Sequence, residues 1–383
     1  MAKKRAAGEG SIRKRKDGRW EGRYVAGHDE HGKAIRKSVL GKTQGEAREK
    51  LKQAIEQSHG LDVAKADSYT VETWLNTWYE LYAKPNIRET TQRSYRGIID
   101  LHILPYIGQI QLTKLTSRDI QKMYNELRAN GNKREATKAR SPGLSSSYVR
   151  GVHMVLHNCL ERAVKEKLIP SNPSGDCIIP KLEKKEMKIL HSEDMTAYLN
   201  EADHRGVLPM FFLELCTGLR KGELAALLWE DLDQEKKTIH VCKQAIGVKG
   251  GGVKVSRPKT ETSIRTIPIP QEAIDQLQKE HEKHPDNPYM FLSPVTGGMY
   301  YPDAITRLHD KVLKSAGIEH IRLHDLRHTF ATTALQNGVD IRTVSGMLGH
   351  FDAGFTLRTY THATNRMQEQ AANTMGSIMA QHI

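Results

Sequence analysis

Cysteine is scarce in this sequence, which has only four such residues among 383. They are scattered, and no two of them form a CxxC pair, a pattern that argues against zinc fingers and against a disulfide framework. A reducing compartment fits this usage. The four are Cys159, Cys177, Cys216 and Cys242.

Long apolar runs are also missing. No stretch approaches the ~20 consecutive apolar residues of a membrane-spanning helix. The first residues, MAKKRAAGEGS, contain no apolar segment of the kind found in signal peptides. We therefore expect a soluble cytoplasmic protein that is not a membrane protein.

Acidic residues are outnumbered by basic ones. The chain has 58 Lys and Arg against 45 Asp and Glu, a formal net charge of +13. Such a charge bears on partners rather than on fold. Nucleic acid is the first candidate partner and an anionic membrane surface the second. The excess is concentrated near the start, because residues 1–60 contain 16 Lys and Arg but only 8 Asp and Glu.

Residues 1–60 have the pattern of a small basic domain with a three-stranded sheet and a helix. Two short segments flank Asp17-Gly18, which is a hairpin signal, and KAIRKSVLG supplies a third strand. The segment TQGEAREKLKQAIEQ then has helical spacing, with Thr43 as its cap and Glu46 three residues later.

One face of the second strand is expected to be polar. Strand alternation puts Arg19, Glu21 and Arg23 on the same face and aromatic residues on the other. A basic sheet face can lie in a DNA groove, as in proteins that read DNA with a β-ribbon; a solvated surface is the alternative. The residues predicted to contact DNA here are Arg13, Lys14, Arg15, Lys16, Arg19 and Arg23.

Residues 68–172 have helical periodicity and predict an all-α domain of roughly four helices. One helical segment is expected to end at Pro105 and Gly108. The next, TSRDIQKMYNELRANG, begins with a Ser/Thr cap and stops at a glycine. Exposed arginines of this domain are predicted to contact DNA phosphates, with a solvated helix face as the alternative for each. They are Arg88, Arg93 and Arg96.

Residues 185–383 predict a mixed α/β domain that is mostly helical and ends in a C-terminal tail. The stretch MFFLELCTGLRKGELAALLWEDLD is apolar and predicted to be helical. KTIHVCK and SIRTIPIP alternate like strands, and between them lies a glycine- and lysine-rich hairpin. The fold class is therefore multidomain: a small sheet with a helix, an all-α domain, and this mixed domain.

Several charged residues of the last domain stand inside apolar elements. Arg220 needs a carboxylate or phosphate partner if it is buried, and Glu223 is an internal candidate. HDLRHTF places His324 and Arg327 on one helix face; by spacing alone it fits a metal site, a phosphate clamp or a solvated helix end. Lys259 alone would be an ordinary exposed lysine, and Tyr360 alone a packing residue.

Five motifs, in order, resemble the catalytic domain of tyrosine recombinases, the family of phage and conjugative-transposon integrases. They are TGLRKGEL, PKTETSIRTIPI, HDLRHTFAT, MLGHFD and TLRTYTH, within residues 185–365. The front half is similar to the plan of integrases that bind arm-type DNA sites with a small sheet domain and core sites with a helical domain. The resemblance implies a metal- and ATP-independent enzyme without a cofactor, acting on the bacterial nucleoid.

The resemblance also assigns the active site. Tyr360 matches the nucleophile, and five residues match the pocket that binds the phosphate: Arg220, Lys259, His324, Arg327 and His350. It leaves Lys221 and His328 without a chemical role. Paired guanidiniums can hold a phosphodiester at fixed geometry without losing their protons, and a cationic pocket favours the phenolate of a tyrosine.

Partners follow from the same resemblance. Strand exchange between two duplexes implies a homotetramer on DNA, and an accessory excision factor is plausible. The tail QEQAANTMGSIMAQHI has apolar residues at helical spacing, and we expect it to dock onto a neighbouring protomer, with packing on its own domain as the alternative.

Two rival functions remain open. His324 and His328 have the i, i+4 spacing of the zinc motif HExxH, although Asp325 stands where that motif has Glu. A zinc hydrolase would also need a third ligand. A regulator that binds DNA without cutting it could use the same basic domains.

Overall fold

The computed structural model describes residues 10–28, 34–58, 68–133, 141–182, 187–248, 251–258, 261–349, 353–360, 372–373 and 375–380. The chain divides into two compact units, Met1–Lys184 and Lys185–Ile383. Within the described residues, no helix has the length and apolar character needed to cross a membrane.

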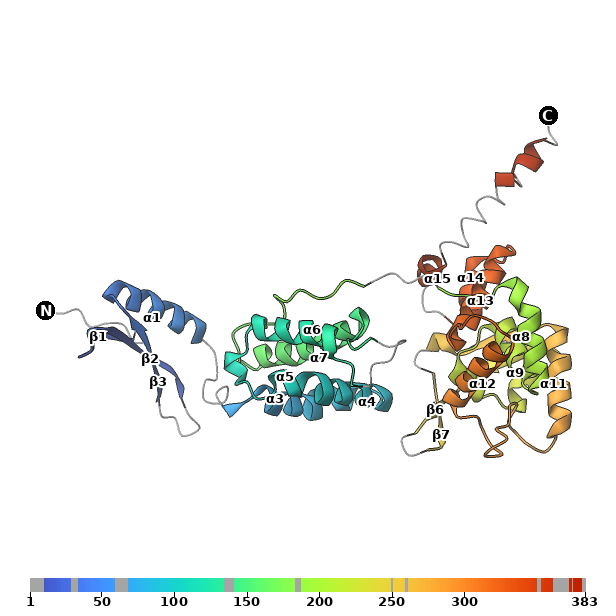
Figure 1. Cartoon of the computed structure of the whole chain (residues 1–383), viewed down its shortest axis with the longest axis horizontal. Coiled ribbons are helices and arrows are strands. Elements are labelled where there is room, and N and C mark those ends of the chain that lie inside the picture. Colours follow the sequence, from blue (N-terminus) through green and yellow to red (C-terminus); the bar gives the residue numbers. More distant parts are fainter. Residues whose placement is uncertain are drawn as a thin grey trace. The chain divides into compact units, whose positions relative to one another are not determined.

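The N-terminal part is an antiparallel sheet with the order β1-β2-β3, covered on one face by a helix (Figure 1). Gly18 allows the turn between β1 and β2, since its φ is +82°. The helix lies close to the sheet, because a Cβ at Gly22 would be 3.1 Å from Leu51 Cβ. The predicted three strands and helix are confirmed as β1 (Ser11–Lys14), β2 (Trp20–His28), β3 (Ala34–Gly41) and α1 (Gln44–Ser58).

Helices alone build the rest of the first unit's described core. Thr70 and Thr116 cap α3 and α6 with reciprocal capping boxes, and the buried Trp74 indole donates to the Cys159 carbonyl of α7 (3.1 Å). The helices are α3 (Val71–Trp78), α4 (Glu89–Ile98), α5 (Leu104–Ile107), α6 (Ser117–Asn130) and α7 (Ser146–Lys165).

Pro105 does not end its helix, contrary to the prediction from the sequence. A π-helical turn, Ile99–Ile103, connects α4 to α5, and Pro105 lies in the first turn of α5. A proline lacks the N–H of a regular α-helical bond, and the wider turn lets the chain pass it without a break. The helix stops at Gly108, as predicted.

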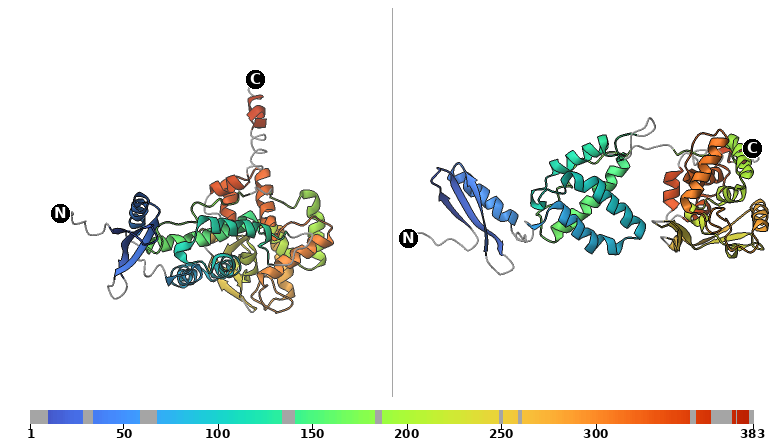
Figure 2. Two further views of the ribbon diagram at one scale, coloured as in Figure 1. Left: turned by 60° about the vertical axis from the view of Figure 1, so that its left-hand side comes forward. Right: turned by 60° about the horizontal axis from the view of Figure 1, so that its bottom comes forward.

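The second unit is mostly helical, with a small sheet in the order β4-β5-β8 and a separate hairpin of β6 and β7. Figure 2 shows the same helices from two further sides. The strands are β4 (Leu232–Asp233), β5 (Thr238–Val241), β6 (Gln244–Gly247), β7 (Val253–Ser256) and β8 (Arg265–Pro268). The helices are α8 (Ser192–His204), α9 (Leu208–Thr217), α10 (Lys221–Ala225), α11 (Gln271–Lys283), α12 (Pro302–Ser315), α13 (Leu323–Gln336), α14 (Ile341–Leu348) and α15 (Ala353–Thr359).

The expected single helix through TGLRKGEL is wrong, because the chain breaks at Gly218. This residue has a φ of +61° and ends α9. A Cβ at this position would lie 2.7 Å from side-chain atoms of Leu348 and Phe330. The break leaves Arg220 in extended conformation at the start of α10, between the two helices rather than within one.

Candidate active site

Arg220 is the N-cap residue of α10 and is hydrogen-bonded to two partners. Its backbone N–H and its Nη1 both donate to the Glu223 carboxylate, at 3.0 and 2.7 Å. Its Nη2 donates to the Gly349 carbonyl at 3.3 Å. The side chain keeps 36% of its surface exposed, so part of the guanidinium remains available to an anion.

Arg327 lies on α13 and is only 2% exposed. Nη1 donates to the Gly218 carbonyl and Nη2 to the Leu348 carbonyl, both at 2.6 Å. Burial, with Arg220 nearby, lowers the pKa of Arg327 to about 9, which leaves it charged at neutral pH. A buried guanidinium therefore stands next to the half-exposed one.

The C-terminus of α14 organises three arginines. Successive carbonyls of residues 347, 348 and 349 accept from Arg265 (2.5 Å), Arg327 and Arg220. The last carbonyls of a helix lack partners within the helix and carry its partial negative charge. Guanidiniums satisfy both needs, so this helix end fixes the positions of the positive charges.

Arg265, on β8, is a site residue that the sequence did not single out. It pairs with the buried Glu223 carboxylate, with Nη2 to Oε2 at 3.0 Å. Burial raises the pKa of Glu223, but the hydrogen bonds and charges of Arg265 and Arg220 outweigh it and hold the pKa below its usual value. The only available signal was an arginine inside the apolar strand SIRTIPI.

Two histidines and Tyr360 form an adjacent group. The His324 and His328 rings lie 4.9 Å apart, centroid to centroid, and Nδ1 of His328 lies 2.7 Å from Oη of Tyr360. Tyr360 is 2% exposed and packs in a cluster with Leu335, Val344 and others. Its burial raises its pKa to about 12, against an opposing effect of Arg327.

The structure thus brings together four of the six predicted active-site residues: Arg220, His324, Arg327 and Tyr360. Partial burial of the His324 ring, with His328 and Arg327 nearby, lowers its pKa to about 4. Lys259 and His350 lie outside the described residues. His328, which the resemblance left unassigned, directly contacts the tyrosine.

The zinc alternative gains no support from this geometry. Nδ1 of His328 is already at hydrogen-bond distance from Tyr360. In the part of the chain that the structure describes, no group of three or more His, Cys, Asp or Glu side chains is arranged to hold a metal ion.

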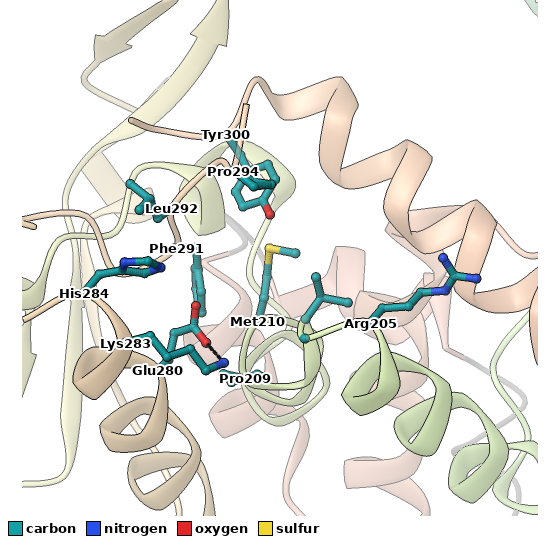
Figure 3. A pocket seen from close by; sticks show the side chains of 12 residues that line it. Arg205, Pro209, Met210, Glu280, Lys283, His284, Phe291, Leu292, Pro294 and Tyr300 are labelled. Carbon is teal, nitrogen blue, oxygen red and sulfur yellow. Dashed lines mark hydrogen bonds and ion pairs between the residues drawn. The ribbon is translucent and has the colours of Figure 1, made fainter. Parts of the chain in front are cut away.

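A separate cavity of about 300 Å³ opens elsewhere in the second unit, lined by the residues after α8, the start of α9, the end of α11 and the segment 291–300 (Figure 3). Its charged residues are paired: Lys283 with Glu280 at 2.6 Å, as the figure shows, and Arg205 with Glu201 at 2.7 Å. None of the four active-site residues located above lines this cavity.

The predicted DNA contacts of the N-terminal sheet fall into three pairs. Arg13 and Arg23 lie on the face opposite α1, and both pair with the buried Glu21, at 2.7 and 3.3 Å. Arg15 and Arg19 pair with Asp17 in the turn. Lys14 pairs in register with Trp20, on the other face, and both Lys14 and Lys16 are exposed.

The predicted DNA contacts of the helical domain also differ from one another. Arg88 and Arg93 are exposed. Arg96 is half-buried and bonded to Asp100 (2.8 Å) and Asn76 (2.7 Å). A phosphate would therefore meet Arg93 more easily than Arg96.

Comparison with known proteins places this geometry in a family. Residues 181–367 match the phage integrase family, and residues 70–128 match the N-terminal SAM-like domain of phage integrases. A "Tyrosine recombinase XerC-like" protein of Caldanaerobacter subterraneus subsp. tengcongensis is 30% identical, over 92% of this chain and 94% of its own.

Solved structures share the fold. The Tn1549 transposon integrase in complex with transposon right end DNA matches with a TM-score of 0.68 and 18% identity, over 79% of this chain and all of that chain. A lambda integrase tetramer bound to a Holliday junction matches with a TM-score of 0.58 and 19% identity, over 89% and 96% of the two chains.

Fold and sequence together define a tyrosine recombinase. The chain belongs to the phage integrase family.

Proposed function

We propose that this recombinase cuts and rejoins DNA at specific sites through a covalent bond between Tyr360 and a 3′-phosphate. One observation carries the assignment of residues: Arg220 and Arg327 bond neighbouring carbonyls at the end of α14, and Arg327 lies close enough to Tyr360 for its charge to act on the phenol. These residues come from separate elements, and no local motif alone would bring them together.

The two arginines are suited to a phosphodiester. Its transition state gains negative charge on the non-bridging oxygens, and guanidiniums fixed in advance stabilise that charge. Arg220 has exposed surface to offer, and Arg327 supplies a nearby positive charge in a buried, water-poor setting. The carbonyls and Glu223 hold both arginines in place before DNA arrives.

The remaining groups follow from the resemblance. Attack by Tyr360 Oη forms the phosphotyrosyl bond and breaks the bond to the 5′-oxygen, which leaves as a hydroxyl. Lys259 protonates this leaving oxygen, His324 acts as a general acid or base, and His350 donates a hydrogen bond to a phosphate oxygen. A 5′-hydroxyl of the partner duplex reverses the step, so that the bond energy is kept and no ATP is needed.

DNA binding must expose the active site before the enzyme can cleave. Tyr360 and Arg327 are each 2% exposed, and a phosphate cannot reach either through that small area. The proposed enzyme is therefore inactive toward small phosphodiesters until duplex binding opens this region.

The role of each domain is also a proposal. Residues 1–60 bind arm-type sites, residues 68–172 bind core sites, and residues 185–383 cut the DNA. Support comes from the exposed basic residues of the first two parts. Four protomers act together on two duplexes of the bacterial nucleoid, with the tail of each docked on a neighbour. An accessory excision factor sets the direction of recombination.

The experiment is to trap the chain on a nicked suicide duplex and identify the linked residue by mass spectrometry. The duplex carries the recombination site, found by sequencing DNA to which the wild-type chain becomes attached. Tyr360→Phe should bind this duplex as wild type does and form no adduct, because only the hydroxyl is removed. An adduct in the Tyr360→Phe variant would refute the assignment.

The same experiment separates the rivals. A regulator that does not cleave would bind the duplex without any adduct in the wild type. A zinc hydrolase would lose cleavage in EDTA, whereas a tyrosine recombinase would keep it.

A further inference from the structure

His328 is the closest polar partner of the proposed nucleophile. It lies one turn after His324 on α13, and its Nδ1 is 2.7 Å from Tyr360 Oη, with the ring centroids 5.6 Å apart. The His324 ring, by contrast, packs against that of His328, with centroids 4.9 Å apart. The group placed to take the phenol's proton is therefore His328, and of the two roles proposed for His324 this leaves that of an acid.

The proton of this hydrogen bond belongs to the phenol. Burial raises the pKa of Tyr360 to about 12, so Oη keeps its hydrogen at neutral pH. Burial lowers the pKa of His328 below 6.5, although Asp325 opposes the change, so the imidazole is neutral. A neutral imidazole with its hydrogen on Nε2 offers the lone pair of Nδ1, and Oη–H donates to it.

Water has little access to take this proton away. Tyr360 is 2% exposed and surrounded by Ala331, Leu335, Val344 and Leu348. Among the residues that the structure describes, Nδ1 of His328 is the hydrogen-bond partner of Oη. A phenol that attacks phosphorus must lose its hydrogen, and here the acceptor is already in place.

One nearby carboxylate, that of Asp325, can stabilise the positive charge that results. Among the described residues, the charged groups acting on His328 are Asp325, Arg322 and Arg327, on α13 or just before it. The His324 ring contacts it from the same helix, and the Tyr360 hydroxyl faces it from the residue after α15. The Asp325 carboxylate, three residues earlier, favours an imidazolium, while the arginines oppose it. Such a base gives up its proton readily when the step reverses.

We propose that His328 is a catalytic base that takes the Tyr360 proton during DNA cleavage and returns it during religation. This inference rests on the proposed function of Tyr360. As Oη forms its bond to phosphorus, the O–H bond breaks and the hydrogen moves to Nδ1, which gives an imidazolium. The bond from phosphorus to the 5′-oxygen breaks, and that oxygen takes its proton from Lys259, as proposed above. In the reverse step, the 5′-hydroxyl attacks and Oη recovers the proton from His328.

The first test needs no DNA. In full-length protein with ¹⁵N-labelled histidine, NMR should show neutral His328 with hydrogen on Nε2 and not on Nδ1. Tyr360→Phe removes the donor that stabilises the neutral form, so the pKa of His328 should rise. Hydrogen on Nδ1, or a pKa that Tyr360→Phe leaves unchanged, would overturn the proposal.

The second test uses the full-length chain and the nicked suicide duplex. His328→Asn keeps an oxygen that can accept the phenol's hydrogen bond but cannot take its proton. Adduct formation should slow by about 10²-fold or more. The wild-type rate should fall as the pH drops through the pKa of His328, and His328→Asn should lose this dependence. His328→Gln, with a longer side chain, should show the same loss.

A matched control comes from the helical domain. Tyr124 Oη and His153 Nδ1 lie 2.9 Å apart, so His153→Asn removes a similar pair far along the chain from Tyr360. This variant should cleave at the wild-type rate with the wild-type pH dependence. Thermal unfolding of each variant checks that it is folded.

A modified duplex separates base from acid. A 5′-bridging sulfur leaves without protonation, so this substrate should restore cleavage to Lys259→Ala but not to His328→Asn. His328 is not the base if the sulfur substrate restores cleavage to His328→Asn. The same conclusion follows if His328→Asn cleaves the ordinary duplex at or above the wild-type rate with the wild-type pH dependence. An adduct formed by Tyr360→Phe would instead refute the proposed function. If Tyr360→Phe forms no adduct while His328→Asn forms it at the normal rate, only the role of His328 is refuted.

Discussion

Glu214 on α9 is buried near Arg327 and, among the described residues, forms no ion pair. It is 1% exposed, and its Oε2 has no hydrogen-bond partner within the described part of the chain. Burial raises the pKa of Glu214 well above its ordinary 4.5, and the charge of Arg327 only partly offsets this. The carboxyl is therefore kept neutral by its surroundings while Glu223, a few residues later, stays charged through Arg265.

This predicts a specific pH dependence of stability. A raised pKa in the folded state means that the folded protein binds a proton that the unfolded chain releases above pH 4.5. The contribution of Glu214 is fully present below that pH and is lost as the pH rises through the folded pKa, at no more than about 1.4 kcal/mol per pH unit. Glu214→Gln should remove this slope in denaturant unfolding. A parallel pH profile of the two proteins would contradict the neutral carboxyl.

Single residues were predictable where a local motif carries them. Arg220, Arg327 and Tyr360 were found in short motifs, and the structure brings them together. Arg265 and His328 stand in the same motifs but were given no role, because their partners are distant in sequence: Arg265 meets Glu223, 42 positions away, and His328 meets Tyr360, 32 positions away. Sequence spacing shows which residues share a helix face and not which other element covers that face.

At the scale of elements, periodicity predicted the strands and most helices but missed two interruptions. Apolar spacing continues across Gly218, so a single helix was the natural expectation. The break depends on Leu348 and Phe330, which occupy the space that a side chain at 218 would need. Pro105 likewise was expected to end a helix, whereas a π-helical turn accommodates it. At Gly218 tertiary packing overrides the local signal, and at Pro105 a local change of helix type does.

The end of α14 allows a test of the arginine arrangement. Gly349 has a φ of +64°, and an added Cβ would lie 3.1 Å from the Arg265 side chain. Gly349→Ala should cost about 1–2 kcal/mol from its left-handed conformation and should also slow adduct formation, since it displaces the arginines bonded there. Unfolding and suicide-duplex assays measure the two effects.

Gly338 provides the control for that prediction. It follows α13 with a φ of +85°, and an added Cβ would meet nothing within 4 Å. Gly338→Ala should lose similar stability while cleaving DNA at the wild-type rate. If Gly349→Ala also cleaves normally, the carbonyls of α14 do not position the arginines.

At the scale of the whole molecule, composition predicted the order of the domains because each part has its own periodicity and charge. The basic excess of residues 1–60 and the alternating strands there indicated a small sheet that meets DNA, and the sheet is present. What composition could not show is that Glu21 lies buried between Arg13 and Arg23 on the predicted DNA face. Pairing of these charges depends on strand register, which a count of residues does not contain.

Truncation at the N-terminus and truncation at the C-terminus should affect DNA binding and assembly differently. Removing residues 1–60 takes away a net charge of +8, from 16 basic and 8 acidic residues, and fewer phosphates are then neutralised. DNA affinity should fall and become less dependent on salt, because each lost phosphate contact lowers the slope of log affinity against log salt by about 0.9. Fluorescence anisotropy at several salt concentrations measures this slope. An unchanged slope would exclude the sheet domain as a DNA binder.

Cutting the chain after Ala363 should instead affect assembly. The described tail residues Met375, Ile378 and Met379 are 53%, 41% and 50% exposed, and apolar side chains presented together favour a protein partner. The truncated chain should bind DNA with the wild-type salt dependence but form fewer tetramers in mass photometry, because it cannot bury these side chains on a neighbour. Wild-type assembly after truncation would mean that the tail packs on its own subunit or on nothing that holds the complex together.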